Sequence, residues 1–232
     1  MNFSNFDKCF DELRVLLRDR LGNGKNTRKL DIYGSYLDYD EEIKIVVNRI
    51  EEETQRFMTL SKSVFEAVQQ GEELDEKWGI ESIQNLTLIR LDIKSFFIYT
   101  RIFLDTLAHI IGQCYGKKGD HLSSHMRKLV GNETFKNLDP AFAQGLKDRM
   151  QWMDDFVKTR DEIMHQLGSI YSTTTKNGKF GFDILGLTTR HDWGANTVES
   201  IADYLNETLH NLSEVISHIH SKFQFSGLAE EL

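Results

Sequence analysis

The stretch FFIYTRIFLDTLAHII, residues 96–111, is the longest apolar run in the chain, and only Arg101, Asp105 and His109 interrupt it. It ends a hydrophobic segment that we expect to form one helix over residues 81–111. A helix that is apolar nearly all round is buried on most sides. The three polar residues recur at every fourth position, so they share one face of that helix. The sequence therefore predicts a central buried helix with a single polar stripe.

Outside this run, proline usage and apolar spacing both favour long helices. The chain has 232 residues but one proline, Pro140, and proline in a helix interior ends or kinks the helix. Apolar residues three and four apart indicate amphipathic helices. Asp139 and Pro140 suit the first positions of a helix, and Gly71 suits the end of one. The further helices that we expect span residues 3–21, 40–70, 140–167 and 196–223, with residues 72–80 as a connection.

Residues 169–185 depart from this helical pattern. Two runs of β-branched and aromatic residues flank Asn177-Gly178, a dipeptide typical of hairpin turns. We therefore expect one β-hairpin at about 170–185, between the last two long helices. No flexible linker separates the halves of the chain, so residues 1–80 are predicted to be a helical extension packed on the helical domain formed by residues 81–232.

The composition restricts the environment and the partners. A net charge of −8 excludes a basic coat for nucleic acid over the whole surface, but it allows a local basic groove. Two cysteines are too few for a disulfide framework and indicate a reducing compartment. Because no long uncharged apolar stretch and no secretory leader are evident, we expect a cytoplasmic protein that does not span a membrane.

One charge falls on the apolar face of the helix expected at 140–167. The residues three and four positions from Arg160 are Phe156, Val157, Ile163 and Met164. A guanidinium keeps its proton in such surroundings, so it needs a carboxylate, a phosphate or water as a partner.

His165 follows five residues later, close to the expected end of the same helix. Asp161, one turn before it, can hold the imidazole and favour its charged form. Arg160 and His165 are not stacked on one helical face, since five residues correspond to about 140° of rotation at 3.6 residues per turn. The arginine is long, however, and both side chains can border one cleft.

The segment Arg160-Asp161-Glu162-Ile163-Met164-His165 resembles the R-x4-6-H motif of the HEPN superfamily, the higher eukaryotes and prokaryotes nucleotide-binding domains. Asp161 matches the polar residue that often follows the arginine, and the resemblance covers about residues 86–223. It implies a HEPN-like helical bundle that forms a homodimer. It also implies a metal-independent endoribonuclease of a toxin or phage-defence type, without cofactor, in which a cognate antitoxin or regulatory protein is a further partner.

The resemblance also implies roles for three residues in RNA cleavage. His165 would act as general acid or base, Arg160 would stabilise charge on the phosphate, and Asp161 would orient His165. Many family members have lost activity, so the alternative is an inactive helical dimer that binds a protein or a nucleotide. In a purely structural interpretation, Arg160 is a buried cation paired with Asp92 or Asp105, and His165 lies at the surface.

Further polar residues have two interpretations each. The stripe of Arg101, Asp105 and His109 is either an ion pair on the helix surface or part of the same cleft as Arg160. His121 and His125 have a spacing that would place two metal ligands on one helical face, but without an H-E-x-x-H pattern we expect no metal site. His218 and His220 are expected at the surface. The residues expected to contact RNA or phosphate are Lys117, Lys118, Arg127 and Lys128.

Overall fold

The computed structural model describes residues 3–21, 39–73, 76–165, 169–174, 180–185, 197–198 and 200–225. Within these residues the chain is mostly α-helical, as predicted, with eight α-helices, one short 3-10 helix and three strands. None of the helices in the described ranges is long and apolar enough to cross a membrane. The elements are α1 (Ser4–Leu21), α3 (Tyr39–Gln69), α4 (Glu76–Cys114), η1 (Gly116–Gly119), α5 (Met126–Val130), α6 (Glu133–Leu138), α7 (Pro140–Arg149), α8 (Met153–His165), β1 (Ser169–Thr174), β2 (Phe180–Leu185), β3 (Thr197–Val198) and α9 (Ile201–Phe225).

The chain divides into two compact units, each assembled from separate segments. The first unit comprises Ile43–Ile98 and Val157–Asn206, and the second comprises Asn2–Glu42, Tyr99–Phe156 and Glu207–Leu232. Both units contain residues from either side of position 80, and the division into residues 1–80 and 81–232 stays a prediction.

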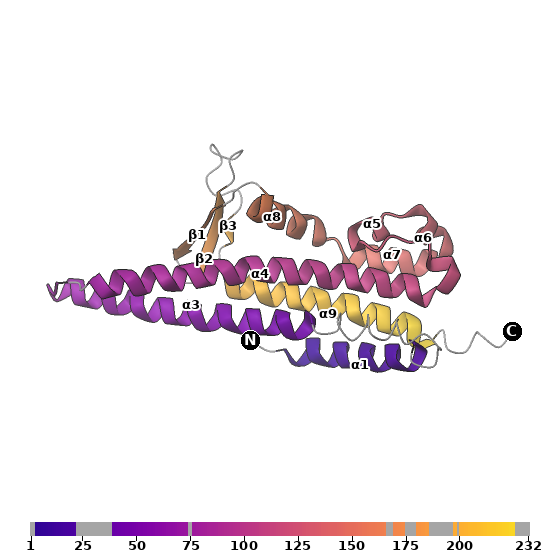
Figure 1. The fold of residues 1–232 in the computed structure, drawn as a ribbon, viewed down its shortest axis with the longest axis horizontal. Coiled ribbons are helices and arrows are strands. Elements are labelled where there is room, and N and C mark those ends of the chain that lie inside the picture. Colours follow the sequence, from indigo (N-terminus) through magenta and orange to yellow (C-terminus); the bar gives the residue numbers. More distant parts are fainter. Residues whose placement is uncertain are drawn as a thin grey trace. The chain divides into compact units, whose positions relative to one another are not determined.

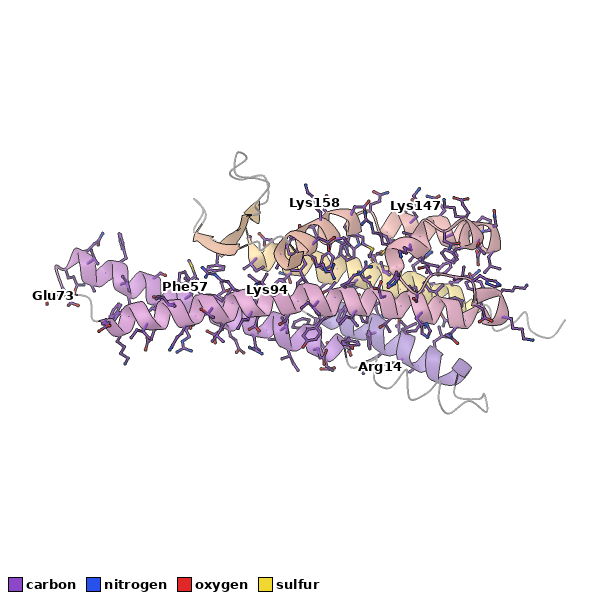
Figure 2. All side chains as sticks on the ribbon, turned by 45° about the horizontal axis from the view of Figure 1, so that its top comes forward. Arg14, Phe57, Glu73, Lys94, Lys147 and Lys158 are labelled. Atoms are coloured by element: carbon purple, nitrogen blue, oxygen red, sulfur yellow. The ribbon has the colours of Figure 1, made fainter. Side chains whose placement is uncertain are left out.

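The first unit is built on a pair of long helices. In Figure 1 the parts of α3 and α4 that belong to this unit run side by side in opposite directions. The apolar side of α3 is buried at Ile43, Val47 and Ile50, as its spacing predicts. Phe57 of α3, labelled in Figure 2, makes an edge contact with Phe180 of β2, with ring centroids 5.5 Å apart. This contact joins the helices to the strands.

The strands form a three-stranded antiparallel sheet in the order β1-β2-β3. In its register Ser169 pairs with Leu185 and Thr174 pairs with Phe180. Strand β3 pairs with β2 and was not anticipated from the sequence. The turn predicted at Asn177-Gly178 lies outside the described residues.

The second unit has a core of aromatic rings. Phe6 and Phe10 of α1 lie against Phe103 of α4, with centroids 6.2 and 5.5 Å away. The ring of Phe135 on α6 meets that of Phe142 on α7 edge-on at 5.7 Å. Such tilted and edge-on pairs are the arrangements that aromatic quadrupoles favour.

The helix predicted over residues 140–167 is interrupted, and this expectation was wrong. Helix α7 ends at Arg149 and α8 begins at Met153. The amides of Met150 and Met153 donate to carbonyls three residues earlier, as in a tight turn. No proline or glycine marks the break. Because both methionines are buried, their packing offsets the lost helical hydrogen bonds. Helix α4 also begins earlier than expected, at Glu76.

Asp139 holds the start of α7 and a neighbouring helix together. As predicted, its carboxylate caps α7, accepting from the amide of Phe142 at 3.2 Å, and Pro140 occupies the first turn. The same carboxylate accepts from the Tyr115 hydroxyl at 2.7 Å and pairs with Lys222 of α9. Burial alone would raise the pKa of Asp139, but the bonds from Lys222, Tyr115 and Phe142 lower it below 3.8. The ionised carboxylate is therefore the form that the fold stabilises.

Replacing Asp139 should weaken the fold in a way that depends on pH. Asp139→Ala removes the helix cap and the bonds to Tyr115 and Lys222. We therefore expect the free energy of unfolding to fall by about 2–3 kcal/mol at pH 7. Because the folded-state pKa is depressed, the stabilisation is complete above about pH 4 and disappears as the pH falls through the lower folded value. Urea unfolding at pH 7 and pH 3 measures this. A difference between wild type and Asp139→Asn that stays constant down to pH 3 would contradict the assignment.

Candidate functional site

The end of α8 carries the arginine that the sequence singled out. The arginine side chain is 29% exposed, and Val157 and Ile163, three residues away on either side, are buried. The expectation of a half-buried cation among apolar residues is therefore confirmed. One terminal nitrogen of Arg160 pairs with the carboxylate of Asp161. The Nε of Arg160 is buried and has no hydrogen-bond partner within the described residues, so the guanidinium keeps donor capacity.

Asp161 is the carboxylate next to the arginine of the motif. Its side chain accepts a hydrogen bond from Arg160. The side chain of His165 lies outside the described atoms, although its backbone completes α8. The roles of His165 as acid or base and of Asp161 as its support stay predictions.

The proposed structural partners of Arg160 are engaged elsewhere. Asp92 is buried and lies 3.0 Å from Arg49 of α3. Its pKa is raised because burial disfavours the charged form more than Arg49 favours it, and Glu53 adds to the rise. Asp105 bonds to Arg101 and His125. In the described residues Asp92 thus pairs with Arg49, and Asp105 pairs with Arg101 and His125. The alternative in which Arg160 pairs with either carboxylate stays a prediction.

The polar stripe of α4 lines a pocket in the second unit. The Nε of Arg101 lies 3.3 Å from Asp105, which confirms the ion pair expected within the helix. The same carboxylate meets Nδ1 of His125 at 3.1 Å. The pocket has a volume of about 420 Å³ and is lined by Ile102, Asp105, Thr106, His109, Ser124 and His125. Arg160 belongs to the first unit, so the stripe and the motif are described separately.

His125 was placed wrongly by the sequence. Residues 120–125 form turns rather than a helix, and His125 is the residue before α5, with an extended backbone (φ −107°, ψ 122°). His121 and His125 thus do not share a helical face. Among the described residues, no three side chains of suitable type are placed to hold a metal ion. One signal in the sequence could have located His125. Asp105 lies on a helix that is expected to be buried, and a buried carboxylate needs polar partners, which other segments of the chain must supply.

The basic residues expected to touch phosphate all lie at the surface. Lys117 and Lys118 are exposed on η1, and Arg127 and Lys128 are exposed on α5. Arg127 pairs with Asp154 at 3.0 Å, which offsets part of this charge. Contact of these residues with RNA stays a prediction.

A larger groove in the first unit has the opposite charge. Its volume is about 740 Å³. Its charged lining residues are Glu51, Glu52 and Glu81 with the single cation Arg56. Excess negative charge repels a phosphate backbone, so size alone does not make this groove a site for RNA.

His218 is a half-buried residue that the sequence placed at the surface. Its ring stacks on Phe142 with centroids 4.9 Å apart, and its Nε2 lies 3.3 Å from the Phe142 carbonyl oxygen. The pKa of His218 is lowered from 6.5, mainly by burial, and the bond to Phe142 opposes this only in part. His220 is also largely covered and lies 3.9 Å from Glu12. Both were misplaced because α9 is enclosed by α1 and α7 in this unit.

The buried imidazole should make stability depend on pH. Below about pH 6.5 the unfolded chain takes up a proton that folded His218 resists, so its contribution to stability falls until the pH reaches the lower folded pKa. His218→Gln should flatten this part of the stability curve, measured by urea unfolding between pH 8 and pH 5. His210→Gln, at an exposed site on α9, is the control and should keep the wild-type slope. Equal slopes in all three proteins would refute the prediction.

Comparisons with protein-family models, with curated proteins and with solved structures found no match for this chain.

Proposed function

We propose that this chain is a metal-independent endoribonuclease with a HEPN-like fold, in which Arg160 and His165 act together at the cleft of a homodimer. The observation that supports this best is their placement. Both belong to the last two turns of the uninterrupted helix α8, and Arg160 is half-buried with a buried donor that has no partner in the described part of the chain. A cation held in this way is suited to an anionic oxygen of a phosphate.

In the proposed reaction the 2′-hydroxyl of RNA attacks the adjacent phosphorus. A bond forms between O2′ and phosphorus, and the bond to the 5′-oxygen of the next nucleotide breaks. One of the two copies of His165 in the dimer takes the proton of the 2′-hydroxyl, and the other gives a proton to the leaving 5′-oxygen. Arg160 stabilises the charge that develops on the phosphate oxygens. The twofold partner supplies the second copy of the pair. The products are a 2′,3′-cyclic phosphate and a 5′-hydroxyl.

The proposed biological setting is a toxin or a phage-defence effector in the cytoplasm. Such a nuclease requires a cognate antitoxin or another regulatory protein as partner, because uncontrolled cleavage of RNA is harmful to the cell. The basic residues at 117–118 and 127–128 are the proposed contacts for the RNA backbone.

The purified chain tests the proposal directly. End-labelled RNA incubated with the protein and excess EDTA should be cleaved to products that end in a cyclic phosphate. Light scattering on the same sample should give the mass of a dimer. A dimer that leaves RNA intact under all conditions would contradict the nuclease and support the second candidate.

The second candidate is an inactive helical dimer that acts as an interaction module. The observation in its favour is the number of large apolar side chains exposed on α3 and α4 in the first unit. Phe65 is 62% exposed and Ile83 is 67% exposed. Large apolar side chains that are exposed to solvent are common at interaction surfaces. The other exposed members are Ile45, Val68, Ile80, Leu88 and Leu91.

A further inference from the structure

The pocket on α4 is organised around one carboxylate, that of Asp105. Its Oδ2 forms an ion pair with Nε of Arg101 at 3.3 Å and a hydrogen bond with Nδ1 of His125 at 3.1 Å. Its Oδ1 accepts from the backbone amide of Met126 at 3.0 Å. Two hydrogen bonds from residues 125–126 and an ion pair within α4 therefore hold this carboxylate in place. It is also the only acid among the residues that line the pocket.

This arrangement fixes the orientation of the His125 ring. An ionised carboxylate only accepts hydrogen bonds, so Nδ1 of His125 carries the proton in the bond to Asp105. The other nitrogen, Nε2, is then left for the pocket, and the side chain is 52% exposed. A neutral ring presents Nε2 as an acceptor, and a protonated ring presents it as a donor.

The other polar side chains that line the pocket have groups that can donate hydrogen bonds. His109 supplies a second imidazole, and Ser124 supplies a hydroxyl. The hydroxyl of Thr106 is used within the helix, where it donates to the carbonyl of Ile102 at 2.9 Å. Arg101 offsets the charge of Asp105. The volume of about 420 Å³ is within the range of pockets for small ligands.

We propose that this pocket binds a phosphate group, either free or carried by a nucleotide. A phosphate fits both states of His125, because its oxygens accept from a protonated imidazole and its P–OH group donates to a neutral one. His109 and Ser124 supply further donors to the other oxygens. Asp105 acts as a positioning residue that holds the His125 ring. The proposal does not depend on the nuclease, because the pocket is formed by the second unit alone.

Imidazole NMR signals test this proposal in the full-length chain. Inorganic phosphate and adenosine 5′-monophosphate are titrated separately at constant pH and ionic strength, with chloride as the reference anion. The signals of His109 and His125 should shift and reach saturation, while that of exposed His210 should not. Tighter binding of the nucleotide would identify a nucleotide site, and equal binding would identify a site for the phosphate group itself.

Variants show which residues make the site. His125→Gln and His109→Gln should each weaken phosphate binding at least about tenfold, the effect of losing a charged hydrogen bond. His210→Gln is the matched control and should bind like wild type. His109 forms no hydrogen bond within the described residues, so its variant tests the site even if His125→Gln fails to fold. Shifts no larger than those caused by chloride, or unchanged affinity in His109→Gln, would overturn the proposal.

Discussion

Arg160→Ala should reduce RNA cleavage by about 100- to 1,000-fold, the range seen when one donor to a developing oxyanion is removed. The guanidinium carries its charge at any relevant pH, and in this chain it is half-buried beside Asp161 with Nε still able to donate. A donor fixed in partly apolar surroundings interacts more strongly with phosphate than one in water. Arg160→Lys should recover little of the rate, because an ammonium cannot reproduce the planar fork.

The assay measures single-turnover cleavage of labelled RNA in EDTA. His165→Ala should cost a similar factor of about 100 to 10,000, as for other general acids and bases. Arg56→Ala is the matched control, since this arginine lies in the acidic groove of the first unit and should not affect the rate. Thermal unfolding of each variant shows that the fold is kept. Wild-type cleavage by folded Arg160→Ala would refute its role while leaving the nuclease itself in place.

Gly119→Ala should be the most destabilising of the simple glycine substitutions. The added Cβ would lie 1.8 Å from the carbonyl oxygen of Gly112 and 2.7 Å from its carbonyl carbon. These atoms belong to the backbone of α4, so no side chain can move aside. The clash can be relieved only if η1 shifts relative to the end of α4. We therefore expect the free energy of unfolding to fall by about 3 kcal/mol. For a chain of this size that lowers the melting temperature by about 6–12 °C.

Two other glycines provide the comparison. Gly79 lies inside α4 with nothing within 4 Å of an added Cβ, so Gly79→Ala should stabilise the protein by up to about 1 kcal/mol through helix propensity. An added Cβ at Gly116 also meets no atom within 4 Å, but this residue has a φ of +57°. Because residues with a side chain disfavour this conformation, Gly116→Ala should lower the free energy of unfolding by about 1 kcal/mol. Calorimetry on the three variants gives the order. If Gly119→Ala is as stable as Gly116→Ala, the backbones of Gly112 and Gly119 do not approach so closely.

Local signals in the sequence predicted the ends of several helices. Asp139 and Pro140 begin α7 as expected, since a cap and a restricted φ act within one turn. Gly71 has a φ of +72° after α3, and the amides of Gly71 and Glu72 donate to Val68 and Ala67. This is the pattern of hydrogen bonds that closes a helix at a left-handed residue. The prediction of Gly71 as the end of α3 is confirmed.

The partners of charged side chains could not be predicted in the same way. The apolar neighbours of Arg160 were correctly expected, because they follow from helical spacing. The carboxylate beside it was not, because Asp161 can adopt rotamers that point toward either neighbour. His125 reaches Asp105 across 20 residues of sequence, and no periodic pattern connects a turn residue to a distant helix.

The sequence by itself determined where most of the long helices lie and which of their faces are apolar, because propensity, capping and periodicity act over one or two turns. Only the tertiary structure decided that the helix expected from Pro140 onward is interrupted at Met150, that a third strand joins the sheet, and that Asp105 holds His125. Each of these results depends on packing or pairing between residues far apart in the chain. The free energy of such contacts exceeds the local preference of a single turn.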